Sequence, residues 1–176
     1  VCSGGTGGRD AAPRDPGASL VLPGRFRAAV FDMDGLLLDT EPLWVAAEAE
    51  LLARHGHVHT AEDAAATHGR SIADSVAVYA ERLDGADPAT LEAELLELMR
   101  AHYAASPPLR PGVRGLLAGL RGRLPLAVAS STSGWLVRTA LGGTGLLDAF
   151  PVVVSGHDLG RPKPAPDVYL AACAAL

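Results

Sequence analysis

Three short apolar runs interrupt a chain whose hydrophobic positions otherwise recur with helical spacing. They cover residues 28–33, 124–130 and 151–155. Short apolar runs of this kind are typical of strands that are buried on both faces of a parallel sheet. Helical segments separate the runs, so the pattern predicts an α/β protein in which helices connect parallel strands.

The long interval between the first two runs is helical almost throughout. Pro42 suits the first turn of a helix that Gly56 follows, and Asp87-Pro88 begins another. We therefore predict a helical cap at residues 42–108, inserted into an α/β core made of residues 26–41 and 109–176. Within the cap the predicted helices cover residues 42–54, 60–68, 71–83 and 87–102, and in the core they cover 113–120, 133–141 and 166–176.

Composition and charge argue against a nucleic-acid-binding protein, a membrane-spanning protein and a disulfide-stabilised secreted protein. The 176 residues carry a net charge of -5, which provides no basic surface for nucleic acid, and no apolar run is long enough to span a membrane. Cys2 and Cys173 lie at opposite ends of the chain, which argues against a disulfide framework and favours a reducing, cytoplasmic location. Residues 1–25 are rich in Gly and Pro and contain no apolar stretch, so we predict a disordered leader rather than a secretory signal.

Polar side chains follow each of the three predicted strands. The carboxyl ends of parallel strands meet at one edge of the sheet, where active sites gather. Carboxylates, hydroxyls and one lysine together suit phosphoryl transfer, since one carboxylate can attack phosphorus and the other can move protons. A divalent cation would reduce the repulsion between carboxylate and phosphate. The residues concerned are Asp32 and Asp34, then Ser130, Ser131 and Thr132, and finally Lys163.

The same residues carry a resemblance to a known family. The run from Asp32 to Thr40 reads Asp-Met-Asp-Gly-Leu-Leu-Leu-Asp-Thr, a later strand ends in Ser130, and Lys163 opens Lys-Pro-Ala-Pro-Asp. These three motifs, in this order, resemble the haloacid dehalogenase superfamily over residues 26–176. The helical insertion after the first motif resembles its β-phosphoglucomutase-like phosphatase branch. The resemblance implies a Rossmann-like, three-layer parallel sheet with a helical cap.

The resemblance also implies a role for each motif residue. Asp32 would be the nucleophile that forms an aspartyl-phosphate, and it would also bind Mg²⁺. Asp34 would be the general acid and base, with its backbone carbonyl on the metal. Ser130 would donate a hydrogen bond to the phosphoryl group, and Lys163 would neutralise charge around it.

Three further positions would complete the substrate site. Backbone N–H groups near Met33 and Ser131 would line the phosphate cradle. Arg70 lies in His-Gly-Arg-Ser, where this branch places a cap loop that faces the substrate. The predicted activity is therefore Mg²⁺-dependent hydrolysis of a small phosphorylated metabolite, most consistent with a sugar phosphate.

Two departures from the family pattern leave alternatives open. Trp44 occupies the position where mutase members carry a proton-handling His, which favours a phosphatase over a phosphomutase. Family members also continue beyond the position of Leu176 and carry a further strand with acidic metal ligands. We therefore expect a truncated chain with an incomplete sheet, in which the first strand is an exposed edge. An inactive fragment or a non-catalytic interaction module remains an alternative, and a monomer is expected where the full core is present.

Other polar residues have simpler interpretations. Asp39 is predicted to cap the helix that follows it, and Trp44 is predicted to pack in the core of the cap. The alternating histidines of residues 55–59 are predicted to form a loop between cap helices rather than a metal site.

Overall fold

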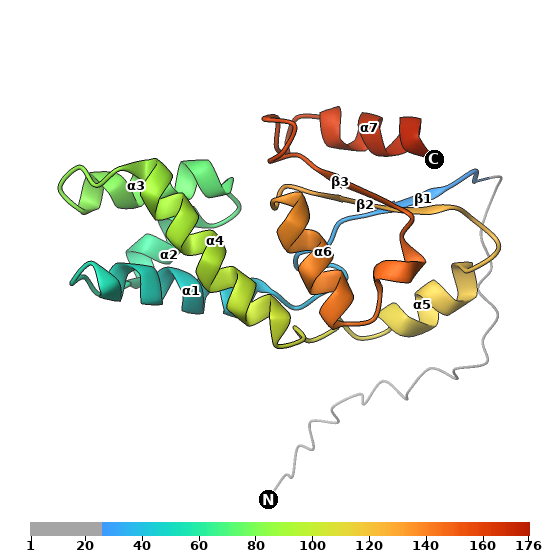
Figure 1. The fold of residues 1–176 in the computed structure, drawn as a ribbon, viewed down its shortest axis with the longest axis horizontal. Coiled ribbons are helices and arrows are strands. Elements are labelled where there is room, and N and C mark those ends of the chain that lie inside the picture. The colour runs from blue at the N-terminus through green and yellow to red at the C-terminus, as the bar shows by residue number, and fades with distance from the viewer. Residues whose placement is uncertain (1–25) are drawn as a thin grey trace, which may run out of the picture.

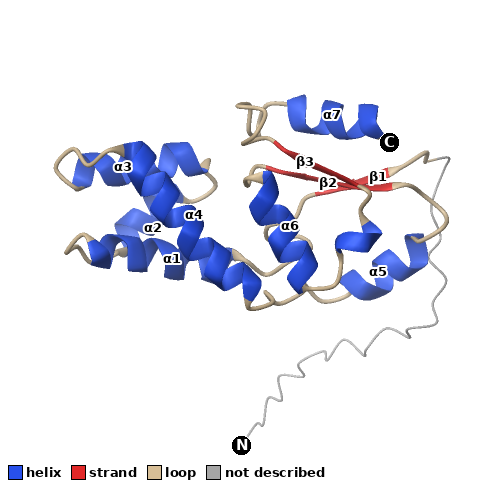
Figure 2. Ribbon diagram, in the orientation of Figure 1, coloured by secondary structure: helices blue, strands red, loops and turns tan. Residues whose placement is uncertain are grey.

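A three-stranded parallel sheet forms the centre of the structure, a computed structural model that describes residues 26–176 (Figure 2). Its strands are β1 (Ala29–Phe31), β2 (Leu126–Ser130) and β3 (Val152–Ser155), in the order β1-β2-β3. Both pairs are parallel. The predicted α/β class with a parallel sheet is confirmed, whereas the predicted leader at residues 1–25 lies outside the described residues.

The strands alternate their side chains between two layers of helices. Val128 of β2 belongs to the main hydrophobic core, while Ala127 and Ala129 pack in a second cluster with Val168 and Ala172. Those last two residues belong to α7 (Asp167–Ala175), which covers one face of the sheet, and α5 (Val113–Leu120) and α6 (Gly134–Gly143) lie on the other (Figure 1). All of β2 is buried, as expected for a strand with helices on both faces.

The strand register brings the polar ends of the strands together. Phe31 pairs with Val128, and Ser130 pairs with Ser155, so all three strands end at the same edge. β1 is shorter than predicted because the chain turns immediately after it. The amide of Leu37 donates to the carbonyl of Met33 at 3.0 Å. Gly35 has a φ of +71° in this turn, a left-handed conformation that favours glycine.

Four helices lie together beside the sheet (Figure 1). They are α1 (Glu41–Arg54), α2 (Ala61–Thr67), α3 (Ile72–Arg82) and α4 (Pro88–Ala104). Side chains cap three of their N-termini, including a full capping box at α2 between Thr60 and Asp63. The helices agree with the predicted segments to within one or two residues, and the division of the chain at residues 42–108 stays a prediction.

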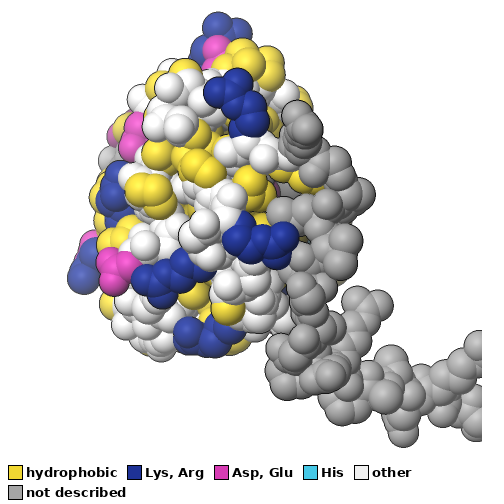
Figure 3. Space-filling view, turned by 90° about the vertical axis from the view of Figure 1, so that its right-hand side faces the viewer, with side chains coloured by type: hydrophobic (Ala, Val, Ile, Leu, Met, Phe, Trp, Pro, Cys, Tyr) yellow, Lys and Arg dark blue, Asp and Glu magenta, His cyan; other side chains and the backbone are white. Residues whose placement is uncertain are grey.

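The sheet edge, one outer surface and the helices add three observations. Over residues 26–176, β1 pairs with β2 alone, so its other edge has no strand neighbour. On the face turned away from α1–α4, Lys and Arg side chains lie apart from one another instead of in one basic patch (Figure 3). In the same part of the chain, the helices are too short or too polar to cross a membrane.

Candidate active site

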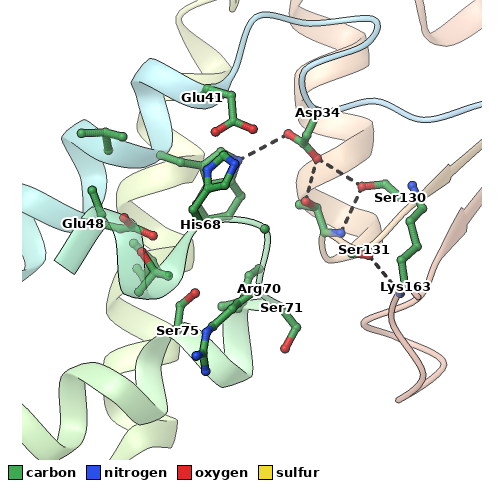
Figure 4. Close-up of a pocket in the computed structure, with 18 of the residues that line it drawn as sticks. Asp34, Glu41, Glu48, His68, Arg70, Ser71, Ser75, Ser130, Ser131 and Lys163 are labelled. Carbon is green, nitrogen blue, oxygen red and sulfur yellow. Dashed lines mark hydrogen bonds between the residues drawn. The ribbon is translucent and has the colours of Figure 1, made fainter. Parts of the chain in front are cut away.

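A cavity of about 340 Å³ lies where the carboxyl edge of the sheet meets the four cap helices (Figure 4). Residues from both sides line it. Met33 is not among them: its side chain is fully buried in the hydrophobic core, and its backbone amide, the group predicted to line the phosphate cradle, donates to Asp32. The structure therefore brings six of the seven predicted site residues to one cavity, namely Asp32, Asp34, Arg70, Ser130, Ser131 and Lys163.

Asp32 directly follows β1, and its carboxylate is held from one side. Its Oδ1 accepts a hydrogen bond of 2.8 Å from the amide of Met33 and lies 2.7 Å from the Nζ of Lys163. Among the described residues, no hydrogen-bond donor contacts the other oxygen, Oδ2. With 38% of its side chain exposed, Asp32 presents a carboxylate that is both anchored and accessible.

Lys163 is positioned by the loop that follows β3. Its backbone amide donates to Ser131 Oγ at 3.2 Å, and its Nζ lies 5.2 Å from the centre of the Tyr169 ring. The loop packs closely against Gly156, where an added Cβ would lie 2.9 Å from the Cα of Pro162. The ammonium nitrogen is buried, and its contact with Asp32 is not aligned as a hydrogen bond. Among the described residues, Lys163 therefore holds a buried cation beside Asp32 whose N–H groups have no aligned acceptor.

The Oδ1 of Asp34 receives three side-chain hydrogen bonds from the cap side. Tyr103 donates at 2.6 Å, Thr40 at 2.9 Å and the indole of Trp44 at 3.4 Å. Burial, followed by the negative charge of Asp34, raises the pKa of Tyr103 well above its usual value. The hydroxyl of Tyr103 therefore keeps its proton and donates throughout the neutral range.

The Oδ2 of Asp34 receives two more hydrogen bonds from the loop after β2. Thr132 donates at 2.8 Å and Ser130 at 3.2 Å, and Ser130 in turn accepts from the amide of Thr132 at 3.0 Å. Five donors from residues 26–176 thus fix the orientation of the Asp34 carboxylate. In this arrangement Ser130 contacts Asp34, and its predicted contact with a phosphoryl group stays a prediction.

The geometry corrects one prediction for a side chain near the site and extends another. Asp39 does not cap α1: its carboxylate pairs with Arg110 at 3.1 Å, and Thr40 holds the cap position without a side-chain cap bond. Trp44 packs against the hydrophobic core, edge-on to the ring of Tyr103, as predicted, but it also faces the cavity. Its indole is partly exposed, lines the cavity and reaches Asp34, because α1 begins immediately after the turn that carries the aspartates.

The cap contributes a polar wall that faces the aspartates. Arg70 is exposed on the loop between α2 and α3, across the cavity from Ser130 and Lys163 (Figure 4). Glu41 and Glu48 line the cavity from α1. By contrast, the histidines of residues 55–59 form a loop, in which His55 pairs with Glu94 at 3.0 Å.

Magnesium fits this donor set through oxygen atoms at the end of β1. Mg²⁺ is usually bound by one or two carboxylates together with substrate phosphate and water. Asp32 has a carboxylate oxygen without a donor, whereas both oxygens of Asp34 already accept hydrogen bonds, which leaves its backbone carbonyl for a metal. Residues 26–176 contain no cluster of three or more His, Cys, Asp or Glu side chains that could hold a metal ion.

Several residues of this site were not predicted from the sequence. Tyr103 lies 69 positions from Asp34 in the chain, and its place in α4 resembles that of any buried aromatic residue. Thr40 ends the aspartate motif and Trp44 follows it by four residues, so their proximity was a usable signal, although their contacts with Asp34 could not be read from the sequence. Glu48 carried the clearest signal, because a carboxylate on the buried face of a helix is uncommon.

Comparison with known proteins relates this chain to a family of hydrolases and to phosphatases. The family model of haloacid dehalogenase-like hydrolases matches residues 26–176. Hexitol phosphatase B of Escherichia coli K12 is 33% identical over 158 residues, which cover 88% of this chain and 71% of that protein. Fructose-1-phosphate phosphatase YqaB of the same organism is 32% identical over 149 residues, or 83% of this chain and 78% of that protein.

Solved structures share the fold. CbbY from Rhodobacter sphaeroides, crystallised in complex with phosphate, aligns with a TM-score of 0.72 at 26% identity and covers 85% of this chain and 72% of that one. β-Phosphoglucomutase from Clostridium difficile also gives a TM-score of 0.72, at 18% identity, over 85% of this chain and 70% of that one, and shows the fold alone. With its motifs gathered in one cavity and phosphatases among its relatives, this chain belongs to the haloacid dehalogenase-like hydrolase family, among its phosphatases.

Proposed function

We propose that this protein hydrolyses small phosphate monoesters through an aspartyl-phosphate on Asp32. The observation that carries the proposal is the pair of aspartates at the end of β1. The Asp32 carboxylate is exposed and ion-paired with Lys163, and Asp34 is held beside it by five hydrogen-bond donors. The two carboxylates thus have different surroundings, which suits a nucleophile and a proton carrier.

In the first half of the proposed reaction, a carboxylate oxygen of Asp32 attacks phosphorus. The bond between phosphorus and the ester oxygen breaks, and the leaving alcohol takes a proton from the carboxyl group of Asp34. The ammonium of Lys163 stabilises the charge on the phosphoryl oxygens. To carry a proton, Asp34 must exchange one of its hydrogen bonds, and those donated by Ser130 and Trp44 are the longest.

In the second half, Asp34 takes a proton from a water molecule as that water attacks phosphorus. The bond between phosphorus and Asp32 breaks, which releases inorganic phosphate and restores the carboxylate of Asp32. Mg²⁺, held by the Asp32 carboxylate and the Asp34 carbonyl, would supply charge neutralisation between the carboxylates and the phosphoryl group. Backbone amides near Met33 and Ser131 would support the phosphoryl oxygens.

The relatives and the cavity favour a sugar phosphate as the substrate. Two relatives above 30% identity are phosphatases named for hexitol phosphates and fructose 1-phosphate. Trp44 supports hydrolysis over a mutase reaction, because an indole N–H can donate a hydrogen bond but cannot accept a proton. Arg70, on the cap wall, would contact the part of the substrate remote from the phosphate.

The proposal is tested by hydrolysis of p-nitrophenyl phosphate with and without MgCl₂. The variant Asp32→Asn should lose activity, while Asp39→Asn, an equivalent change at the exposed pair with Arg110, should keep it. If Asp32→Asn hydrolyses the ester as fast as the unchanged chain, the proposed nucleophile is wrong. If the correctly folded chain shows no Asp32-dependent hydrolysis at all, the non-catalytic alternative is favoured.

A further inference from the structure

Glu48 is a buried carboxylate that the proposed reaction does not use. It lies on α1, one helical turn beyond Trp44, and its side chain is 11% exposed. Residues four apart lie on the same face of a helix, about 6 Å further along its axis. Since Trp44 contacts Asp34 and both residues line the cavity, Glu48 occupies the cap wall at a distance from the reacting aspartates.

Two hydroxyl groups and one histidine surround the carboxylate of Glu48. The hydroxyls of Tyr79 and Thr67 lie next to its carboxylate, and His59 Nε2 is 3.7 Å from its Oε2, beyond hydrogen-bond distance. Tyr79 itself donates to Thr67 Oγ1 at 3.4 Å. Burial raises the pKa of Glu48, and the charge of Glu41 adds to the rise, while the hydroxyl of Tyr79, the nearby His59 and the hydroxyl of Thr67 offset part of it. A buried acceptor of this kind gains stability when a further donor reaches it from the cavity.

The charges around the cavity indicate the chemistry of that donor. Glu41 and Glu48 are the acidic residues of the cap wall, and Arg70 is its one permanent cation among the described residues. Hydroxyl groups of Ser71 and Ser75 lie beside Arg70 (Figure 4). A second phosphate or a carboxylate placed near Glu48 would meet a like charge, whereas an alcohol would find an acceptor.

We propose that Glu48 accepts a hydrogen bond from a hydroxyl of the substrate and thereby selects neutral polyhydroxy phosphate monoesters over esters with a second anionic group. This inference rests on the proposed phosphatase function and names the substrate class of the same cavity. The phosphate lies at Asp32 and Lys163, and the hydroxylated carbon chain extends along α1 toward Glu48. Glu48 is a specificity residue in this arrangement and takes no part in breaking the ester bond.

The test compares three substrates in the unchanged chain, in Glu48→Gln and in Glu48→Leu. For sorbitol 6-phosphate, kcat/KM should fall about tenfold in Glu48→Leu, which loses the acceptor, and by less in Glu48→Gln, whose amide oxygen still accepts a hydrogen bond but carries no charge. For phosphoglycolate it should rise because the repelling charge is gone, and for p-nitrophenyl phosphate it should stay within about twofold. Glu50→Gln provides a matched control, since Glu50 lies on the same helix, outside the cavity, and pairs with Arg54 at 2.7 Å.

Binding separates this inference from the proposed function. Isothermal titration of sorbitol 6-phosphate into the Asp32→Asn variant should show an affinity that falls about tenfold when Glu48→Leu is added, whether or not the chain turns over. If the unchanged chain hydrolyses none of the substrates but the binding difference is observed, the phosphatase function is contradicted and the role of Glu48 in binding is supported. Equal effects on all three substrates, no effect on sorbitol 6-phosphate, or a preference of the unchanged chain for phosphoglycolate would overturn the role of Glu48.

Discussion

Removing the hydroxyl of Tyr103 tests how the cap positions Asp34. The variant Tyr103→Phe deletes one oxygen atom from a fully buried side chain and leaves the aromatic ring in place. The ring should keep its edge-on contact with Trp44, whose centroid is 6.4 Å away at an interplanar angle of 87°. The change therefore removes the 2.6 Å hydrogen bond to Asp34 Oδ1 and creates little empty space.

The expected magnitude follows from the acceptor and its remaining partners. A hydrogen bond to a charged group contributes about 1.5–3 kcal/mol. Asp34 Oδ1 keeps the bonds from Thr40 and Trp44, so it is not left unsatisfied, and the lower end of that range applies. We expect the free energy of unfolding to fall by about 1.5 kcal/mol and kcat to fall about tenfold, because the carboxylate that carries the proton is less well oriented.

Two measurements separate positioning from general stability. Urea unfolding gives the change in stability, and kcat with saturating p-nitrophenyl phosphate gives the change in turnover, at a temperature where both proteins are folded. A retained kcat, within about twofold, together with the expected loss of stability would refute the claim that Tyr103 orients Asp34.

Three further predictions concern Thr132 and Lys163 in the site and His157 in the loop that follows β3. Thr132→Val removes a hydrogen bond to Asp34 and should lower kcat for p-nitrophenyl phosphate about tenfold. Thr144→Val changes an equally buried threonine that is bonded to backbone carbonyls, and it should leave kcat within about twofold. Equal losses of kcat in the two variants would contradict the role of Thr132. Lys163→Met should lower kcat/KM for p-nitrophenyl phosphate at least about 100-fold, and a loss below fivefold would exclude a role in charge stabilisation. Burial lowers the pKa of His157, but its contacts with Glu92 and the adjacent carboxylate outweigh this and raise the pKa above its usual value. The stability that this pair contributes is therefore complete below about pH 6.5 and is lost as the pH rises through the raised pKa. The difference in urea midpoint between the unchanged chain and His157→Asn should therefore narrow as the pH is raised. A difference that stays constant over this pH change would contradict the prediction.

The sequence allowed most elements to be predicted because their signals are local. The buried β2 and the capped starts of α2, α3 and α4 follow directly from apolar runs and from Ser, Thr and Asp at helix starts. The 3₁₀ turn at Leu147–Ala149 was not predicted, since three residues carry no period. The strand order also lies beyond periodicity, because pairing depends on contacts between distant segments.

The candidate site likewise contains residues that could be predicted from the sequence and residues that could not. Asp32, Asp34 and Lys163 could be predicted because each follows a strand, and the topology of a parallel sheet brings strand ends together. The contacts of Tyr103 and Glu48 could not, because they depend on how the cap helices pack over the sheet. Asp39 was wrongly predicted to be a cap because its type and position fit that role, while the nearby Arg110 offers a charged partner instead.

The central claim of this account is that Asp32 becomes phosphorylated during turnover. Borohydride reduces an acyl phosphate on aspartate to homoserine, so treatment of the protein during hydrolysis of p-nitrophenyl phosphate marks the modified position. Tandem mass spectrometry of the tryptic peptide that spans residues 28–54 then distinguishes Asp32 from Asp34 and Asp39. We predict homoserine at position 32, dependent on substrate. Hydrolysis without this product, or with the label at another aspartate, would contradict the account.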